Sequence, residues 1–238
     1  MERRIPWIFG SLAATIAALV LVAPTTAGAQ DYTVQLNSYN GPATVYVSRT
    51  AIRKTEPGFK TDVIYRLAEN KIITIDHEQK TYSEVTVAQE RQINAQATAT
   101  LSPQLQAMRS RLGLNNPPSF TTLGPGDTIA GYATEKYEIK TPAMTMEIWA
   151  APALSIPPAY YEVFRIGAGP GSGFVGGTPI PSREALKKIT GMILKRVITT
   201  TLLNGTTLTE EATAVTTSPI PTSTFAPPAG YTKVVSES

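Results

Sequence analysis

The 238-residue sequence contains no cysteine and a single histidine, His77. The absence of thiols excludes disulfide bonds and thiolate metal sites, although exported domains often rely on disulfides. A zinc site needs three or four His, Cys or carboxylate ligands, and nucleophilic catalysis needs a base beside the nucleophile. We interpret the histidine as a solvated residue of a hairpin turn. The sequence therefore predicts no metal, no cofactor and no catalytic triad built on histidine.

Long apolar runs are also scarce, and the one that exists lies at the start of the chain. A short basic segment precedes the apolar stretch 5–23, and residues 27–29 have the small-x-small pattern that signal peptidases cleave. We expect cleavage after Ala29, which would place the protein in the periplasm or outside the cell. The alternative is an uncleaved membrane anchor, because the run approaches the roughly 17–25 residues of a spanning helix. After cleavage we expect no stable membrane span.

Charged residues make up only 16% of the chain and form no long run of one sign. Residues 1–29 hold two of the 21 basic and one of the 18 acidic residues, which leaves 19 and 17 and a net charge of +2 for the mature chain. Nucleic-acid binding normally shows a clustered Lys/Arg face, and the sequence has none. We therefore expect no nucleic-acid partner.

What the mature chain does contain is two-residue alternation of apolar and polar side chains. Residues 61–87 indicate three short strands joined by polar turns, which is the pattern of an antiparallel meander. Asn204-Gly205, between two Thr-rich segments, is a strong hairpin signal. Further strands are predicted at 31–39, 43–52, 144–150, 192–203 and 206–217, with a strand pair inside 128–142.

Two helices are predicted after the meander. Residues 88–99 are polar on most sides, with Ile93 as the main apolar anchor. Ser102-Pro103 is typical of an N-cap followed by proline at the first helical position. In this second helix the apolar side chains recur at helical spacing, at Leu105, Met108 and Leu112. We expect the second helix to lie across the sheet.

Roughly ten strands are more than a flat open sheet comfortably holds, so the sheet should curl. We predict one mainly β (α+β) domain at residues 30–238, with a single curved antiparallel sheet or incomplete β-barrel and one or two helices on its concave face. The candidate ligand-binding residues are three from the second helix and three from a wall strand: Leu105, Met108, Leu112, Met144, Met146 and Trp149. The alternative is that these residues form the packed core.

Two other patterns bear on function. Residues 171–176 match G-x-G-x-x-G, but prolines separate them from the next helix and the neighbouring strands are antiparallel. We interpret residues 167–177 as a glycine loop rather than a nucleotide site. Asp127, Glu135 and Glu147 would favour an enzyme only if they gathered around a polar pocket.

Three segments share their pattern and order with a known family: IDHEQKTYSEV at 75–85, GDTIAGYATEKYEI at 126–139 with EIW downstream, and FAPPAGY at 225–231. The chain resembles an exported bacterial family known only as domain of unknown function 4412. The resemblance implies a fold like that of periplasmic lipoprotein carriers, a curved sheet with helices plugging its concave face. It implies no catalytic residues. In FAPPAGY, we expect Phe225 and Tyr231 to pack against the sheet edge.

The leading hypothesis is a non-enzymatic envelope protein that binds a hydrophobic or amphipathic ligand, such as a lipid or acyl chain, in the concavity. Methionine is a soft, adaptable side chain that suits such a surface. The second hypothesis is a structural or interaction module that contacts other envelope proteins through sheet edges or the Thr-rich hairpin. An enzyme is the third.

Overall fold

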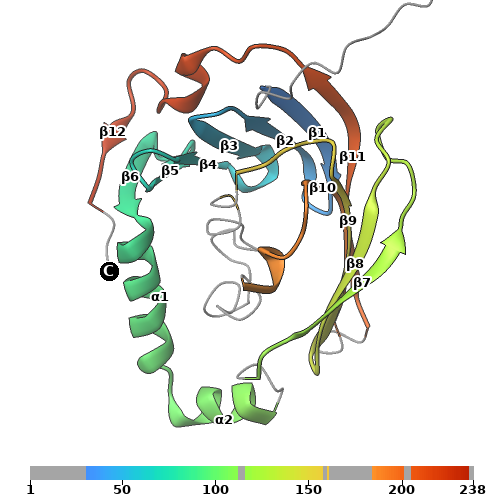
Figure 1. The fold of residues 1–238 in the computed structure, drawn as a ribbon. Helices are drawn as coiled ribbons and strands as arrows, with labels where there is room; N and C mark the ends of the chain where they lie inside the picture. Colours follow the sequence, from blue (N-terminus) through green and yellow to red (C-terminus); the bar gives the residue numbers. More distant parts are fainter. Residues whose placement is uncertain (1–30, 112–115, 158–159, 161–183, 201–204, 236–238) are drawn as a thin grey trace, which may run out of the picture.

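The computed structural model describes residues 31–111, 116–157, 160, 184–200 and 205–235 (Figure 1). Within these residues twelve strands form one open, strongly curved sheet. The strands are β1 Tyr32–Ser38, β2 Gly41–Val47, β3 Ala51–Glu56, β4 Thr61–Arg66, β5 Lys71–Asp76, β6 Thr81–Thr86, β7 Ser119–Pro125, β8 Glu135–Thr141, β9 Met144–Ala151, β10 Met192–Thr200, β11 Thr207–Thr217 and β12 Thr232–Lys233.

The sheet consists of two antiparallel meanders, β1–β6 and β7–β11, joined where β1 pairs with β11. The two-residue strand β12 is parallel to β6 and lies at one edge, while β7 lies at the other. This mainly β architecture confirms the predicted fold class. The three strands predicted in 61–87 are also confirmed, as is the antiparallel pairing of the strands that flank Asn204-Gly205, although residues 201–204 lie outside the described residues. Gly205 has the positive φ (77°) that favours glycine.

The segment 43–52 was predicted as one strand, and this was wrong. The chain turns between β2 and β3 because Ser48 bonds locally to the backbone: its Oγ accepts the amide of Ala51 at 3.0 Å and donates to the Ala51 carbonyl at 2.9 Å. Short polar side chains that satisfy nearby backbone groups compete in this way with the strand ladder. The alternation on either side hid the turn.

The predicted strand pair inside 128–142 was also wrong. Only β8 is a strand there, and its hairpin partner is the earlier strand β7. Between them, Ile129 and Tyr132 form an isolated bridge across a tight turn in which Ala130 and Gly131 both have positive φ (48° and 85°). Gly124 and Pro125 obscured β7 in the sequence, since both residues are rare inside strands.

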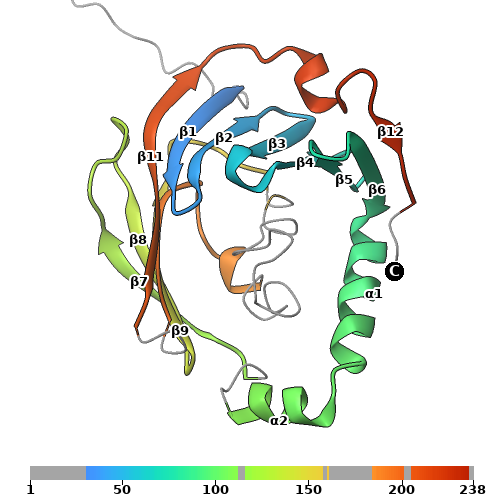
Figure 2. The same ribbon diagram turned by 180° about the vertical axis from the view of Figure 1, so that it is seen from behind.

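The two predicted helices are present as α1 Val87–Ala99 and α2 Pro103–Arg111. The Ser102 Oγ accepts the amide of Leu105 at 3.3 Å, as expected of an N-cap. Figures 1 and 2 show α1 continuing from β6 along the open side of the arc and α2 at its far end, instead of across the sheet. Too few of the side chains of α2 are apolar to bury one of its faces. None of the described helices has both the length and the apolarity needed to cross a membrane.

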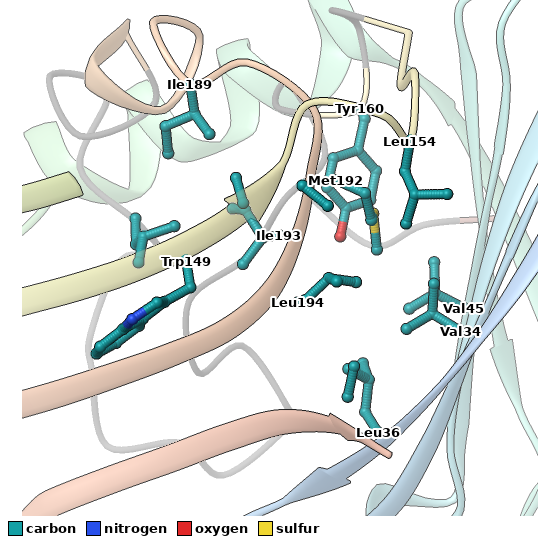
Figure 3. Packing of buried hydrophobic residues seen from close by; sticks show 14 of the residues in the cluster. Val34, Leu36, Val45, Trp149, Leu154, Tyr160, Ile189, Met192, Ile193 and Leu194 are labelled. Atoms are coloured by element: carbon teal, nitrogen blue, oxygen red, sulfur yellow. The ribbon is translucent and has the colours of Figure 1, made fainter. Parts of the chain in front are cut away.

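The concave face is filled by two segments that flank residues 161–183. Leu154 and Tyr160 come from the segment after β9, and Leu186 and Ile189 from the segment before β10. They pack with Val34, Val45 and Leu194 of the strands in one buried cluster (Figure 3). These residues, rather than α2, supply the plug that we expected on this face.

The outer face of β3–β5 is covered by the C-terminal strap, residues 220–235, which includes the 3₁₀ turn Thr222–Phe225 (Figures 1 and 2). Phe225 is 6% exposed and packs with Ile64, Ile73 and Ile75, and Tyr231 lies against the same cluster. The predicted packing of Phe225 and Tyr231 is confirmed, although they lie on the outer face of the sheet.

Candidate functional site

Of the six residues predicted to line a ligand cavity, four have side chains that the structure describes: Leu105 on α2, and Met144, Met146 and Trp149 on β9. On β9, Met146 is fully buried in the core and Met144 is partly buried against it. Leu105 is partly buried on α2. The side chain of Met108, and all of Leu112, lie outside the described residues. The burial of Met146 agrees with the alternative stated above, in which the candidate residues form the packed core.

Trp149 points to the opposite face of β9 from Met146, because side chains alternate along a strand. Its ring lies between the Nζ of Lys136 (4.5 Å to the centroid) and that of Lys195 (5.2 Å) on the two neighbouring strands. These ammonium groups pair in turn with Glu147 at 2.5 Å and Glu211 at 2.9 Å. Trp149 is 7% exposed and belongs to the main buried cluster, and the two lysines form a cation–π ladder with its ring.

The structure instead contains a groove of about 630 Å³ between the edge of β6, helix α1 and the end of the strap. Small-molecule sites typically have volumes of ~300–1,000 Å³. Apolar side chains come from all three walls: Val85 from β6, Ile93 from α1, and Val234 and Val235 from the strap. Val234 is 41% exposed and Val235 89%, so the strap wall is apolar and faces solvent.

The polar lining comes mainly from α1. Gln89, Gln92 and Gln96 follow one another at helical spacing on the face that also carries Ile93. The Gln89 Oε1 accepts the amide of Thr86 at 2.8 Å, which fastens the first turn of α1 to the end of β6. This face of α1 therefore combines one apolar side chain with three uncharged amides.

The groove is continuous with the apolar interior through Val85. Val85 packs with the buried residues Tyr65, Ile72 and Val87, which form a cluster beside the main core. Cross-strand pairing explains the contact, because Tyr65 is opposite Ile72 and Ile72 is opposite Val85. An apolar row thus runs from the sheet interior to the groove.

The charges at the groove are neutralised within the protein. The Glu84 carboxylate accepts Lys233 Nζ at 2.9 Å and lies 3.3 Å from Lys71 Nζ, which also contacts Glu69 at 2.9 Å. The hydrogen bond from Lys233, helped by Lys71 and opposed by partial burial, lowers the pKa of Glu84. Two carboxylates and two ammonium groups leave no net charge at this rim.

A polar network holds the strap that forms the groove wall. The Tyr231 hydroxyl lies 2.8 Å from Nδ1 of His77, whose Nε2 lies 3.0 Å from Oδ2 of the buried Asp62. Arg53 also bonds Asp62 and donates to the Thr224 carbonyl at 2.7 Å. His77 lies in the predicted turn and is partly exposed, but both of its ring nitrogens have protein partners because the strap returns to this turn from far along the sequence.

A second network is buried on the concave face, where Arg196 pairs with Glu210 of the neighbouring strand. Lys54 of β3 lies 3.2 Å from the same glutamate and 3.0 Å from Glu56. Arg196 is 3% exposed and Glu210 6%. Sequence analysis did not single out these residues, since one polar residue inside a strand gives no signal of its partners.

The arrangement needed for the enzyme hypothesis is not formed by its candidate residues. Glu135 and Glu147 lie on opposite faces of the β8–β9 pair, since Glu135 is on the face of Tyr137 and Glu147 on that of Trp149. Across the described residues, no group of three or more His, Cys, Asp or Glu side chains is placed to hold a metal ion.

Comparison with known proteins gives one family match. The sequence model of the family described as "Domain of unknown function (DUF4412)" matches residues 43–231. No curated protein matches the chain.

Two solved structures are similar to the chain over most of its length. They are described as the structure of PNGF-II in the C2 and P21 space groups, with TM-scores of 0.45 and 0.44 and sequence identities of 13% and 14%. They cover 88% and 87% of this chain, which itself spans about a third of theirs (31% and 32%).

Proposed function

Because the chain belongs to the family of domain of unknown function 4412, whose description assigns no activity, we propose from its geometry that it is an exported, non-enzymatic protein that binds a hydrophobic or amphipathic ligand. The site is the groove between β6, α1 and the strap. One observation carries the proposal: an open groove of about 630 Å³ has apolar side chains on all three walls and continues into the buried cluster through Val85. Solvent-facing Val234 and Val235 favour an apolar occupant.

Export is the second part of the proposal. It rests on the basic segment, the apolar stretch and the AGA pattern of residues 1–29. In the envelope, the protein would hold a lipid or acyl chain away from water in a groove that stays open at the rim. The mature chain would begin at Gln30.

The test is native mass spectrometry of protein purified gently after expression of the full sequence. The unbound mass reports whether cleavage occurs after Ala29. We expect an additional mass of lipid size that disappears on solvent extraction and returns on incubation with envelope lipids. Ile93→Asp should abolish it, because a carboxylate would be desolvated against the acyl chain. Leu123→Asp, at a residue that is 48% exposed on the distant strand β7, is the matched control. A spectrum without added mass, before and after incubation, would contradict ligand binding.

A second candidate function is protein interaction through the edge strand β7. In the part of the chain that the structure describes, β7 pairs only with β8, so its other side presents unpaired backbone groups beside Leu123. Strand addition is a common way to recognise such an edge. Loss of cross-linking to envelope proteins in Leu123→Asp, with ligand mass unchanged, would favour this function over the first.

A further inference from the structure

We infer that the groove selects an uncharged amphiphile, an alkyl chain whose head carries hydroxyl or amide groups, over an anionic or cationic one. This inference rests on the proposed function and names the ligand class of the same site. Its basis is the division of the lining into apolar and neutral polar side chains. The apolar part comprises Val85, Ile93, Val234 and Val235.

The glutamines provide the recognition of the head. In the described structure, the side-chain amides of Gln92 and Gln96 make no hydrogen bond to protein, and both residues are exposed. Each amide has two N–H donors and a carbonyl acceptor. Hydroxyl and amide heads also donate and accept, so they satisfy both kinds of group at once. A carboxylate head only accepts, and a quaternary ammonium head does neither.

The charged rim disfavours ionic heads. Lys233 and Lys71 already bond the same Glu84 carboxylate. The two carboxylates and two ammonium groups of the rim cancel, so an anionic or a cationic head would meet no uncompensated opposite charge there. An ionic head would therefore lose part of its hydration in the groove without a net electrostatic gain in return. An uncharged head leaves the rim intact.

The test uses the mature protein and three amphiphiles of equal chain length below their critical micelle concentrations: octyl glucoside, octanoate and octyltrimethylammonium. Dissociation constants come from equilibrium dialysis, and side-chain amide NMR signals of Gln92 and Gln96 report contact with the head. We expect octyl glucoside to bind about tenfold more tightly than either ion, which corresponds to about 1.4 kcal/mol. Its titration should shift both amide signals.

Variants separate head recognition from binding of the alkyl chain. The double variant Gln92→Leu with Gln96→Leu should remove the preference for octyl glucoside while retaining binding of the alkyl chain. The control is Gln104→Leu, at an exposed glutamine on α2, which should leave all three dissociation constants unchanged. Gln92→Glu with Gln96→Glu should instead favour octyltrimethylammonium.

Three results would overturn the inference. Tighter binding of octanoate or octyltrimethylammonium by the native protein would refute the ligand class and leave the groove as a binding site. A preference that survives both double variants would refute the role of the glutamines. Absence of binding of all three amphiphiles would refute the proposed function together with the inference.

Discussion

At the scale of single residues, Glu210 is held ionised inside the protein by two cations. Burial is the largest influence and opposes its ionisation, but the attraction of Arg196 and Lys54 together outweighs burial and lowers the pKa of Glu210. The pair joins β10 to β11 on the concave face and lies beside Tyr160 of the plug. Removal of one partner would leave a charge buried without compensation.

We predict that Glu210→Ala destabilises the protein by about 3–5 kcal/mol, the cost typical of breaking a buried ion pair. The neighbouring Glu211→Ala is a matched control, because Glu211 pairs with Lys195 while its side chain is 44% exposed, and exposed pairs contribute about 0–1 kcal/mol. Urea unfolding of both variants measures the difference. A similar decrease in unfolding free energy in the two variants would show that the buried ion pair stabilises the protein no more than the exposed one.

The same pair should make stability depend on pH. A carboxylate with a lowered folded-state pKa contributes stability above its unfolded-state value, 4.5, and loses it as the pH falls through the folded-state value. The unfolding free energy of the native protein should therefore decrease on acidification below about pH 4.5, and that of Glu210→Gln should decrease less. A parallel decrease in both would assign the acid sensitivity to other carboxylates.

At the scale of elements, the C-terminal strap determines whether the groove has its third wall. The strap is anchored by Phe225 and by Tyr231, and beyond them the amides of Thr232 and Val234 bond the carbonyls of Lys80 and Tyr82 at 3.0 and 2.8 Å. Strand β12 is only two residues long, so these bonds alone are a weak attachment. Side-chain anchors therefore position the apolar residues that follow.

We predict that Tyr231→Phe loosens the strap without unfolding the sheet. Loss of the hydrogen bond to His77 should cost about 1 kcal/mol, and amide hydrogen exchange at Thr232 and Val234 should accelerate about fivefold, while core strands exchange as before. Tyr132→Phe, near the opposite end of the sheet, is the control. If exchange at the strap does not change, packing of Phe225 alone must hold it.

At the scale of the whole molecule, the pairing of β1 with β11 joins the two meanders into one sheet. The main core also crosses this junction, since Val34 and Val45 of the first meander pack in the same cluster as Met146 and Leu194 of the second. Backbone bonds and side chains thus couple the halves. The arrangement favours a single cooperative unit over two independent domains.

We predict that both halves unfold together. Trp149 is the one tryptophan outside residues 1–29, so its fluorescence reports the second meander, whereas the far-ultraviolet circular dichroism reports the whole sheet. The two signals should give the same urea midpoint. Two separated midpoints would identify two domains and contradict the single domain expected at residues 30–238.

Much of the fold could be predicted because its signals are local. Alternation identified most strands, Asn204-Gly205 identified a hairpin, and Ser102-Pro103 identified the start of α2. The errors at 43–52 and 128–142 occurred where a serine side chain or a tight turn ended a strand that alternation alone would have continued. The helical spacing of the glutamines on α1 can be seen in the sequence. These glutamines line a groove only because the strap lies beside α1 in the folded chain.

The sequence by itself determined the mainly β class, the order of most elements and the absence of disulfides, because side-chain periodicity and turn chemistry act over a few residues. Only the tertiary structure decided which residues share a surface. It put Trp149 and Met146 on opposite faces, brought Tyr231 to His77, and placed Val234 and Val235 beside Ile93. These contacts join segments far apart in the chain, and a local pattern carries no information about its distant partner.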